Sequence, residues 1–121
     1  MRLLIIGKYS RITQFFKDHL NQKFKLSIKN YNDVIKKKSN YFKRFDYIIN
    51  CASNKRYVNY KYNSFYDYDY QIVKKIVNFK TSYVFLSTRK VYKPGNNCLE
   101  NDKLKPRCNY SKNKLITEKR L

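Results

Sequence analysis

The segment MRLLIIGKYSRIT, residues 1–13, decides the fold that the sequence predicts. Its apolar run Leu3–Ile6 is ended by Gly7, and apolar residues then recur every three or four positions as far as Leu20. That recurrence is the spacing of one face of a helix. A short apolar strand followed at once by a glycine turn and a helix is typical of the central strand of a parallel α/β sheet.

Two later apolar runs, Tyr47–Ile49 and Tyr83–Leu86, indicate strands buried on both faces of such a sheet. The alternating segment Phe24–Ile28 indicates a fourth strand nearer an edge. The helical stripes around these strands are Ile12, Phe15, Phe16, His19 and Leu20; Ile72, Val73, Ile76 and Val77; and Leu115, Ile116 and Leu121. We expect His19 to be a packing residue of the first stripe. The alternation of strands and helices predicts one domain, residues 1–121, with a Rossmann-like doubly wound parallel sheet in three α/β/α layers, incomplete at its carboxyl end.

The chain carries a strong positive charge. Its 121 residues include 28 Lys and Arg against 8 Asp and Glu, which gives a formal net charge of +20. Such a field attracts polyanions, so a basic nucleic-acid-binding domain is one interpretation, with cations on phosphates and aromatic rings on bases. The cations are spread along the chain rather than gathered in one block, which disfavours a nucleic-acid partner.

The sequence does not have the residues of the commoner metal and nucleophile sites. Its three cysteines form no Cys-x-x-Cys pair, and His19 is the single histidine. This excludes the usual zinc sites and a Ser/His or Cys/His catalytic pair. No secretory leader pattern is expected at the start, and no apolar stretch has the length of a membrane span. These features predict a cytoplasmic protein without a metal site.

The residues that follow each strand are the candidates for chemistry, because ligands of parallel α/β sheets bind at the carboxyl ends of the strands. A dinucleotide-binding turn uses small residues for a tight bend, for close approach of the backbone to pyrophosphate and for helix packing. Gly7, Ser10 and Thr13 occupy these positions, so two glycines of the usual pattern are replaced. Ala52 and Ser53 follow another strand and leave room for a flat ligand.

Tyr110 and Lys114 form the second candidate site. They are four positions apart, so a helix brings both side chains to one face. An ammonium beside a phenol lowers the phenol's pKa, which is about 10 in model compounds. A tyrosine tuned in this way can exchange a proton with a substrate hydroxyl. A solvated helix face is the alternative interpretation, because Tyr and Lys are both abundant in this chain.

Four segments, taken in order, resemble the extended short-chain dehydrogenase/reductase family of NAD-dependent epimerases and dehydratases. They are MRLLIIGKYSRIT (1–13), FDYIINCAS (45–53), YVFLSTRKVY (83–92) and ENDKLKPRCNYSKNKLITEK (100–119). The short connection between Ile28 and Asp46 is most similar to the dTDP-4-dehydrorhamnose reductase branch. The resemblance covers nearly the whole chain and corresponds to the family's amino-terminal Rossmann part, without its substrate-binding carboxyl-terminal region.

The resemblance implies hydride transfer between a nicotinamide ring and a carbon of a nucleotide-activated sugar, in the biosynthesis of surface polysaccharide. Tyr110 would be the general acid/base, Lys114 would lower its pKa and hold the nicotinamide ribose, and Thr88 would hydrogen-bond the reacting sugar oxygen. The other cofactor-binding positions would be Gly7, Ser10, Arg11, Ile12, Ala52 and Ser53. The cofactor would be NAD or NADP. NADP is favoured, because the second strand ends at Lys29 and Asn30 with no acid for a ribose 2′-hydroxyl.

Three functions therefore stay open: an enzyme of nucleotide sugars, a non-catalytic Rossmann-fold binding or assembly partner, and a nucleic-acid-binding domain. Thr88, Tyr110 and Lys114 favour the first over the third. The replaced glycines and the missing half favour the second over full activity. A homodimer, or a partner chain that supplies the missing region, would cover the apolar surface left exposed. The stripe of residues 72–77 is expected to pack in the core rather than form a dimer face.

Overall fold

The computed structural model describes residues 1–87, 106 and 108–121. These residues form a parallel sheet of four strands in the order β2-β1-β3-β4. The strands are β1 (Arg2–Ile6), β2 (Lys25–Lys29), β3 (Tyr47–Asn50) and β4 (Ser82–Val84). The sequence predictions that the first strand lies centrally and that the second lies at an edge are confirmed.

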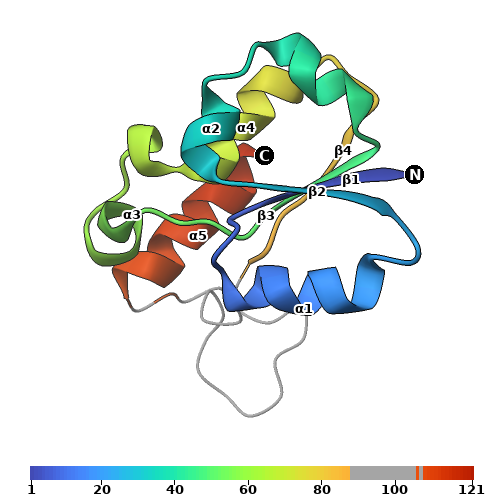
Figure 1. The fold of residues 1–121 in the computed structure, drawn as a ribbon. Coiled ribbons are helices and arrows are strands. Elements are labelled where there is room, and N and C mark those ends of the chain that lie inside the picture. Colours follow the sequence, from blue (N-terminus) through green and yellow to red (C-terminus); the bar gives the residue numbers. More distant parts are fainter. Residues whose placement is uncertain (88–105, 107) are drawn as a thin grey trace.

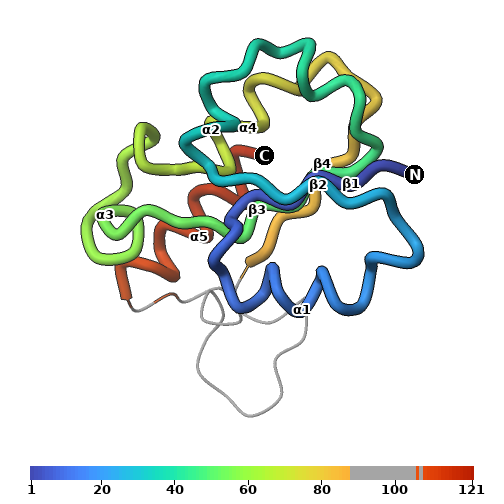
Figure 2. The backbone as a smooth tube through the Cα atoms, viewed as in Figure 1, coloured from blue at the N-terminus to red at the C-terminus, as the bar shows by residue number. Residues whose placement is uncertain are grey.

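The helices lie on both faces of this sheet. α1 (Arg11–Leu20) lies on one side of the strands, whereas α2 (Tyr31–Ile35) and α4 (Tyr68–Ile76) lie on the other (Figure 1, Figure 2). α3 (Lys55–Asn59) and α5 (Asn109–Arg120) contact each other, and α5 also contacts α4. Two 3₁₀ helices, η1 (Ser39–Arg44) and η2 (Ser64–Tyr66), complete the connections. The predicted Rossmann-like α/β fold is confirmed.

Alternate residues of β1 enter two separate cores, as the side-chain period of a strand requires. Leu4 and Ile6 pack with residues of α2, η1 and α4, among them the fully buried Phe42. Leu3 and Ile5 pack on the opposite face, where α1 supplies Phe16 and Leu20. The apolar run that opens the sequence is therefore continuous because both faces of its strand are buried.

The face that α1 turns toward the sheet differs from the predicted stripe. Thr13 is buried and Phe16 packs on the sheet, whereas Phe15 and His19 are exposed. The His19 ring stacks on the Phe15 ring with their centroids 4.0 Å apart, and His19 Nδ1 lies 2.8 Å from the Phe15 carbonyl oxygen. The prediction that His19 packs in the core is wrong, because the apolar stripe is wider than the arc of α1 that reaches the sheet.

The predictions for β4 and α4 have different outcomes. β4 covers only the first part of its apolar run, and Val84 is 39% exposed. The expectation of a strand buried on both faces is therefore wrong for β4, which forms one edge of the described sheet. In α4, Ile72 and Ile76 are buried in the core, which confirms core packing for these two residues.

Within the described part of the chain, no helix is long and apolar enough to cross a lipid bilayer.

Replacing Phe42 by Ala tests whether the core between η1 and α4 carries the stability of the sheet. We expect the free energy of unfolding to fall by about 3–5 kcal/mol, because the change leaves a cavity in a fully buried position. Phe65→Ala is the matched control: this ring is 72% exposed, and its loss should change stability by less than about 0.5 kcal/mol. Urea unfolding followed by circular dichroism measures both, and equal effects would contradict the assigned core.

Candidate functional site

The turn after β1 requires a glycine. Gly7 has a φ of +111°, in the left-handed region that side chains disfavour. A Cβ atom at this position would lie 2.9 Å from both the Ala52 nitrogen and the Cys51 carbonyl carbon. The end of β1 is thus held directly against the backbone that follows β3.

Ser10 and Thr13, which replace the other two glycines of the dinucleotide pattern, close this turn with hydrogen bonds. The Ser10 amide donates to the Gly7 carbonyl oxygen over 3.0 Å, and the Ile12 amide donates to the Ser10 hydroxyl over 3.3 Å. The buried Thr13 hydroxyl donates to the same Gly7 oxygen over 2.6 Å. The turn therefore keeps its tight form, since small hydroxyl side chains fit where glycines usually stand.

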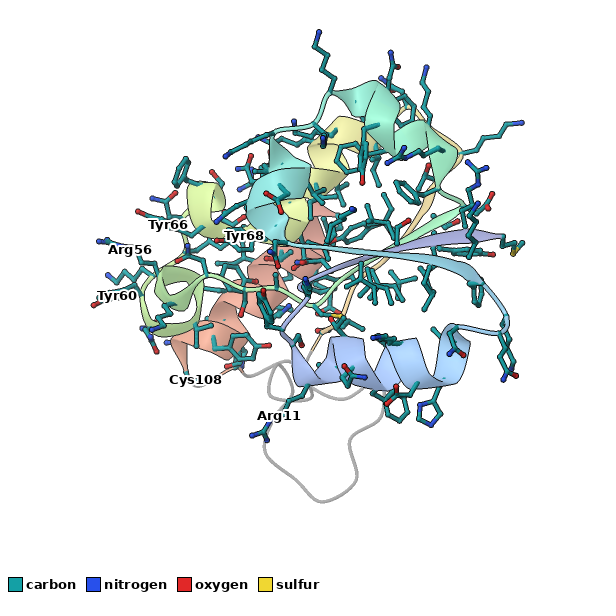
Figure 3. All side chains as sticks on the ribbon, viewed as in Figure 1. Arg11, Arg56, Tyr60, Tyr66, Tyr68 and Cys108 are labelled. Carbon is teal, nitrogen blue, oxygen red and sulfur yellow. The ribbon has the colours of Figure 1, made fainter. Side chains whose placement is uncertain are left out.

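The remaining residues predicted to bind a cofactor lie around this turn. Arg11 is the first residue of α1 and points away from the sheet into solvent (Figure 3). Ile12, which follows it, is exposed. Ala52 and Ser53 follow β3, where the Ala52 amide donates to the Asn50 side-chain oxygen over 3.0 Å. The structure brings these residues to the carboxyl edge of the sheet; their role in binding a cofactor stays a prediction.

Lys114 is buried on α5, and its ammonium already has partners. Its Nζ donates to the carbonyl oxygen of Leu86 over 2.9 Å and lies 3.7 Å from the Asp69 carboxylate. The ammonium also lies 4.6 Å from the centre of the Phe85 ring and 5.8 Å from that of Tyr110. The helix thus brings Tyr110 and Lys114 together, as their spacing predicts.

The pKa of the Tyr110 phenol differs in direction from the sequence expectation. Burial raises this pKa first, and the negative charge of Asp69 and that of Cys108 raise it further. Lys114 does not lower this pKa, although its ammonium lies 5.8 Å from the centre of the Tyr110 ring. Tyr110 is therefore protonated at neutral pH and can donate a proton.

Asp69 belongs to the candidate site, although the sequence did not indicate it. Besides Lys114, its carboxylate accepts hydrogen bonds from the Tyr83 hydroxyl and from Asn50 Nδ2, the latter over 3.2 Å. Burial raises the pKa of Asp69, and the opposing charge of Lys114 is the largest influence that lowers it. One carboxylate therefore joins α4, α5 and the ends of β3 and β4.

A second missed acid, Asp67, holds α5 in place. Fully buried, it caps α4 by accepting from the Tyr70 amide over 3.1 Å, and it accepts from the hydroxyls of Tyr62 and Thr117, each over 2.7 Å. The buried residues of α5 are Ser111, Asn113, Lys114 and Thr117. The expected apolar stripe is therefore wrong, since polar side chains make the inner face of this helix. An Asp ahead of an apolar helix is an N-cap signal that could have identified Asp67.

Thr13 of the turn and Lys114 of α5 both act on one side chain that follows β3, the free thiol of Cys51. Burial raises the pKa of this thiol, while a hydrogen bond from Thr13 and the charge of Lys114 oppose the rise. The phosphate-type turn and the candidate proton donor thus lie at one edge of the sheet. Thr88, the third predicted catalytic residue, lies outside the described residues.

Comparison with known proteins gives matches in structure but not in sequence. No protein-family model and no curated protein sequence matches the chain. A dTDP-4-dehydrorhamnose reductase from Clostridium acetobutylicum matches with a TM-score of 0.74 and 21% identity. TunA, an NAD-dependent NDP-hexosamine 5,6-dehydratase of tunicamycin biosynthesis, matches with a TM-score of 0.75 and 18% identity. A Thermus thermophilus UDP-glucose 4-epimerase in complex with NAD matches with a TM-score of 0.69 and 15% identity.

These three matches cover 98% of this chain and 48%, 48% and 49% of the solved chains. The chain therefore spans about half the length of the proteins whose structures it matches. At these identities the likeness establishes the fold. This fold is the one that the sequence resemblance to the extended short-chain dehydrogenase/reductase family implies.

Replacing Asp69 by Asn tests the electrostatics of the pair. The change removes a negative charge that raises the pKa of Tyr110 and frees the ammonium of Lys114, so we expect the Tyr110 pKa to fall. The measurement is a pH titration of the tyrosine ring carbons by NMR, with Tyr110 assigned from a Tyr110→Phe spectrum. Asp18→Asn, at an exposed position of α1, is the control and should leave that pKa unchanged. A Tyr110 pKa that stays the same or rises in Asp69→Asn would contradict the assignment.

Proposed function

We propose that this chain is the nucleotide-binding part of an NAD(P)-dependent oxidoreductase that acts on a nucleotide-activated sugar. The observation that carries the proposal is the placement of Tyr110 and Lys114 on α5, at the same sheet edge as the Gly7 turn. The solved neighbours, whose names include an NAD-dependent dehydratase and a UDP-glucose 4-epimerase with NAD, support the same general chemistry.

The residues around Gly7 fit a dinucleotide. The Gly7 turn leads into the amino-terminal end of α1, where helix amide groups favour a negatively charged phosphate. In this proposal Gly7, Ser10, Arg11 and Ile12 lie along the pyrophosphate, and Arg11 adds its exposed guanidinium. Ala52 and Ser53 lie beside the cofactor, and Lys114 holds its ribose. The nicotinamide, when bound, supplies or accepts the hydride.

Tyr110 is the proton donor of the proposed reaction. Because burial and Asp69 raise the pKa of its phenol, the protonated form prevails at neutral pH and donates to an oxygen that gains negative charge. This state suits reduction of a carbonyl more than oxidation of an alcohol. Thr88 is proposed as the second group that binds the sugar oxygen. The half-length match means that sugar-binding residues would come from another region or a partner subunit.

Charge at the end of β2 favours NADP over NAD. Lys29 lines a surface hollow of about 480 Å³ together with three further cations and one acid. The other charged residues of this hollow are Lys36, Lys37, Arg44 and Asp33. A 2′-phosphate adds negative charge to the adenosine ribose, so an excess of cations at this position stabilises NADP relative to NAD.

Fluorescence titration of NADPH and NADH with the purified protein, at 0.15 M salt, tests both parts of the proposal. We expect saturable binding of both and tighter binding of NADPH. Lys29→Met should weaken NADPH binding by about tenfold and leave NADH nearly unchanged, since only NADPH places a phosphate there. Lys61→Met, an exposed lysine outside this hollow, controls for non-specific attraction to a chain of charge +20.

Two results would overturn parts of this assignment. No binding of either nucleotide at millimolar concentration would exclude the oxidoreductase. Equal losses from Lys29→Met and Lys61→Met would show that the charge of the whole chain, not a site, attracts NADPH.

A non-catalytic Rossmann-fold partner is the second candidate, and the pairing of Lys114 with Asp69 favours it, because the negative charge of Asp69 offsets the positive charge that would activate Tyr110. Tight NADPH binding with no hydride exchange toward any dTDP- or UDP-linked keto-sugar would support it. The biosynthesis of surface polysaccharide in the cytoplasm is the setting that we propose for the catalytic form.

A further inference from the structure

A hollow of about 360 Å³ lies at the end of the molecule that α3 and η2 form. Its lining residues come from these two elements and from the segment that joins them: Arg56, Tyr60, Lys61, Asn63 and Tyr66. Arg56, Tyr60 and Tyr66 point outward on this side of the molecule (Figure 3). The hollow contains none of the residues proposed to bind a cofactor, and its volume is within the range of ligand pockets, about 300–1,000 Å³.

The charge around this hollow is positive. Residues 47–66 include the cations Lys55, Arg56 and Lys61 and no acid. All three cations are exposed, whereas Asp67, the next acid along the chain, is fully buried. The only ion pair among the residues that the structure describes joins α4 and α5, so no described carboxylate neutralises these cations. The surface therefore attracts a negatively charged ligand.

Two tyrosine rings lie beside these cations. Tyr60 is 64% exposed, and the Arg56 guanidinium lies over the Tyr66 ring, 5.5 Å from its centre. Aromatic rings and guanidinium planes are the surfaces on which unstacked nucleobases stack. An acidic peptide would use the cations but would have no planar group for the rings. The combination of flat rings and free cationic charge therefore favours a ligand that carries both bases and phosphates.

Both walls of the hollow are fixed before a ligand binds. On the α3 side, the buried Asn113 of α5 donates from Nδ2 to the carbonyl oxygens of Tyr57 and Tyr60, over 2.7 and 2.8 Å. On the η2 side, Gln71 Nε2 of α4 donates to the Ser64 carbonyl oxygen over 2.7 Å. The rings are therefore carried by backbone that is tied to the two long helices beside it, and binding requires little ordering of the chain.

The cations are spread along the sequence, but the fold places two of them with two tyrosines around this one hollow. A strand of several nucleotides can contact the hollow and also the field of a chain of charge +20. In a duplex the bases stay stacked inside, where the rings cannot reach them. We propose that the hollow between α3 and η2 binds single-stranded nucleic acid, with bases on Tyr60 and on the Arg56–Tyr66 pair and a phosphate at Lys61. This inference goes beyond the proposed oxidoreductase and does not rest on it.

Fluorescence anisotropy of a labelled thymidine strand of about 15 nucleotides, at roughly 0.15 M salt, measures this binding. Tyr60→Ala should raise the dissociation constant about tenfold, because it removes a ring on which a base stacks. Arg56→Gln should raise it by a similar factor. The matched controls are Tyr9→Ala, at a ring that is 84% exposed outside the hollow, and Lys17→Gln, at an exposed cation of α1. Each control should change the dissociation constant by less than about twofold.

An abasic strand of the same length keeps the phosphates and lacks the bases, so it should bind more weakly and should not respond to Tyr60→Ala. Saturating NADPH should leave the thymidine strand bound, which separates this hollow from the proposed cofactor site. Circular dichroism verifies that each variant is folded.

Three results would overturn the proposal. Equal losses from Tyr60→Ala and Tyr9→Ala, or from Arg56→Gln and Lys17→Gln, would show that the charge of the whole chain binds the strand. Equally tight binding of a duplex, or of polyglutamate of the same charge, would show that the rings read no bases. Displacement of the strand by NADPH would assign the binding to the cofactor site.

Discussion

The burial of the Lys114 ammonium is the constraint on which the arrangement of the site depends. A charge removed from water is strongly unfavourable unless it is paired and hydrogen-bonded. Here the Asp69 carboxylate lies 3.7 Å away and the Leu86 carbonyl oxygen 2.9 Å away. Because these partners come from α4 and from the segment after β4, the ammonium can be satisfied only when α5 lies against both. Tyr110, one turn earlier on α5, takes its position from that contact.

Two neighbouring acids connect the stability of the fold with the chemistry of the site. Asp67 begins α4 and accepts a hydrogen bond from Thr117, so it joins the start of one helix to the middle of another. Asp69 pairs with Lys114 and contributes to the raised pKa of Tyr110. A substitution at Asp67 is therefore expected to change the docking of α5, and one at Asp69 is expected to change the proton affinity of the phenol as well. The Gly7 turn is independent of these acids, because backbone conformation and two hydroxyl groups hold it.

Three of the strands were predictable from the sequence as short apolar runs and β2 was predictable from its alternation, while Gly7 indicated the central strand. Periodicity predicted where α1 lies but not which arc faces the sheet, since Ile12, Phe16 and Leu20 all belong to one broad stripe. The inner face of α5 could not be predicted from apolar spacing, because it is polar and its partners lie 28 to 60 residues away in the chain. Asp69 was missed for the same reason: its partners come from distant strands and helices.

We propose that the Gly7 turn and α5 form a single nucleotide site. Titration of NADPH into ¹⁵N-labelled protein, with the amide signals of Gly7, Ile12, Tyr110 and Lys114 followed together, tests it most directly. We expect all four signals to shift with one dissociation constant, and we expect Gly7→Ala to abolish the shifts on α5 as well as those in the turn. Shifts limited to exposed lysines, or shifts of α5 that survive Gly7→Ala, would contradict it.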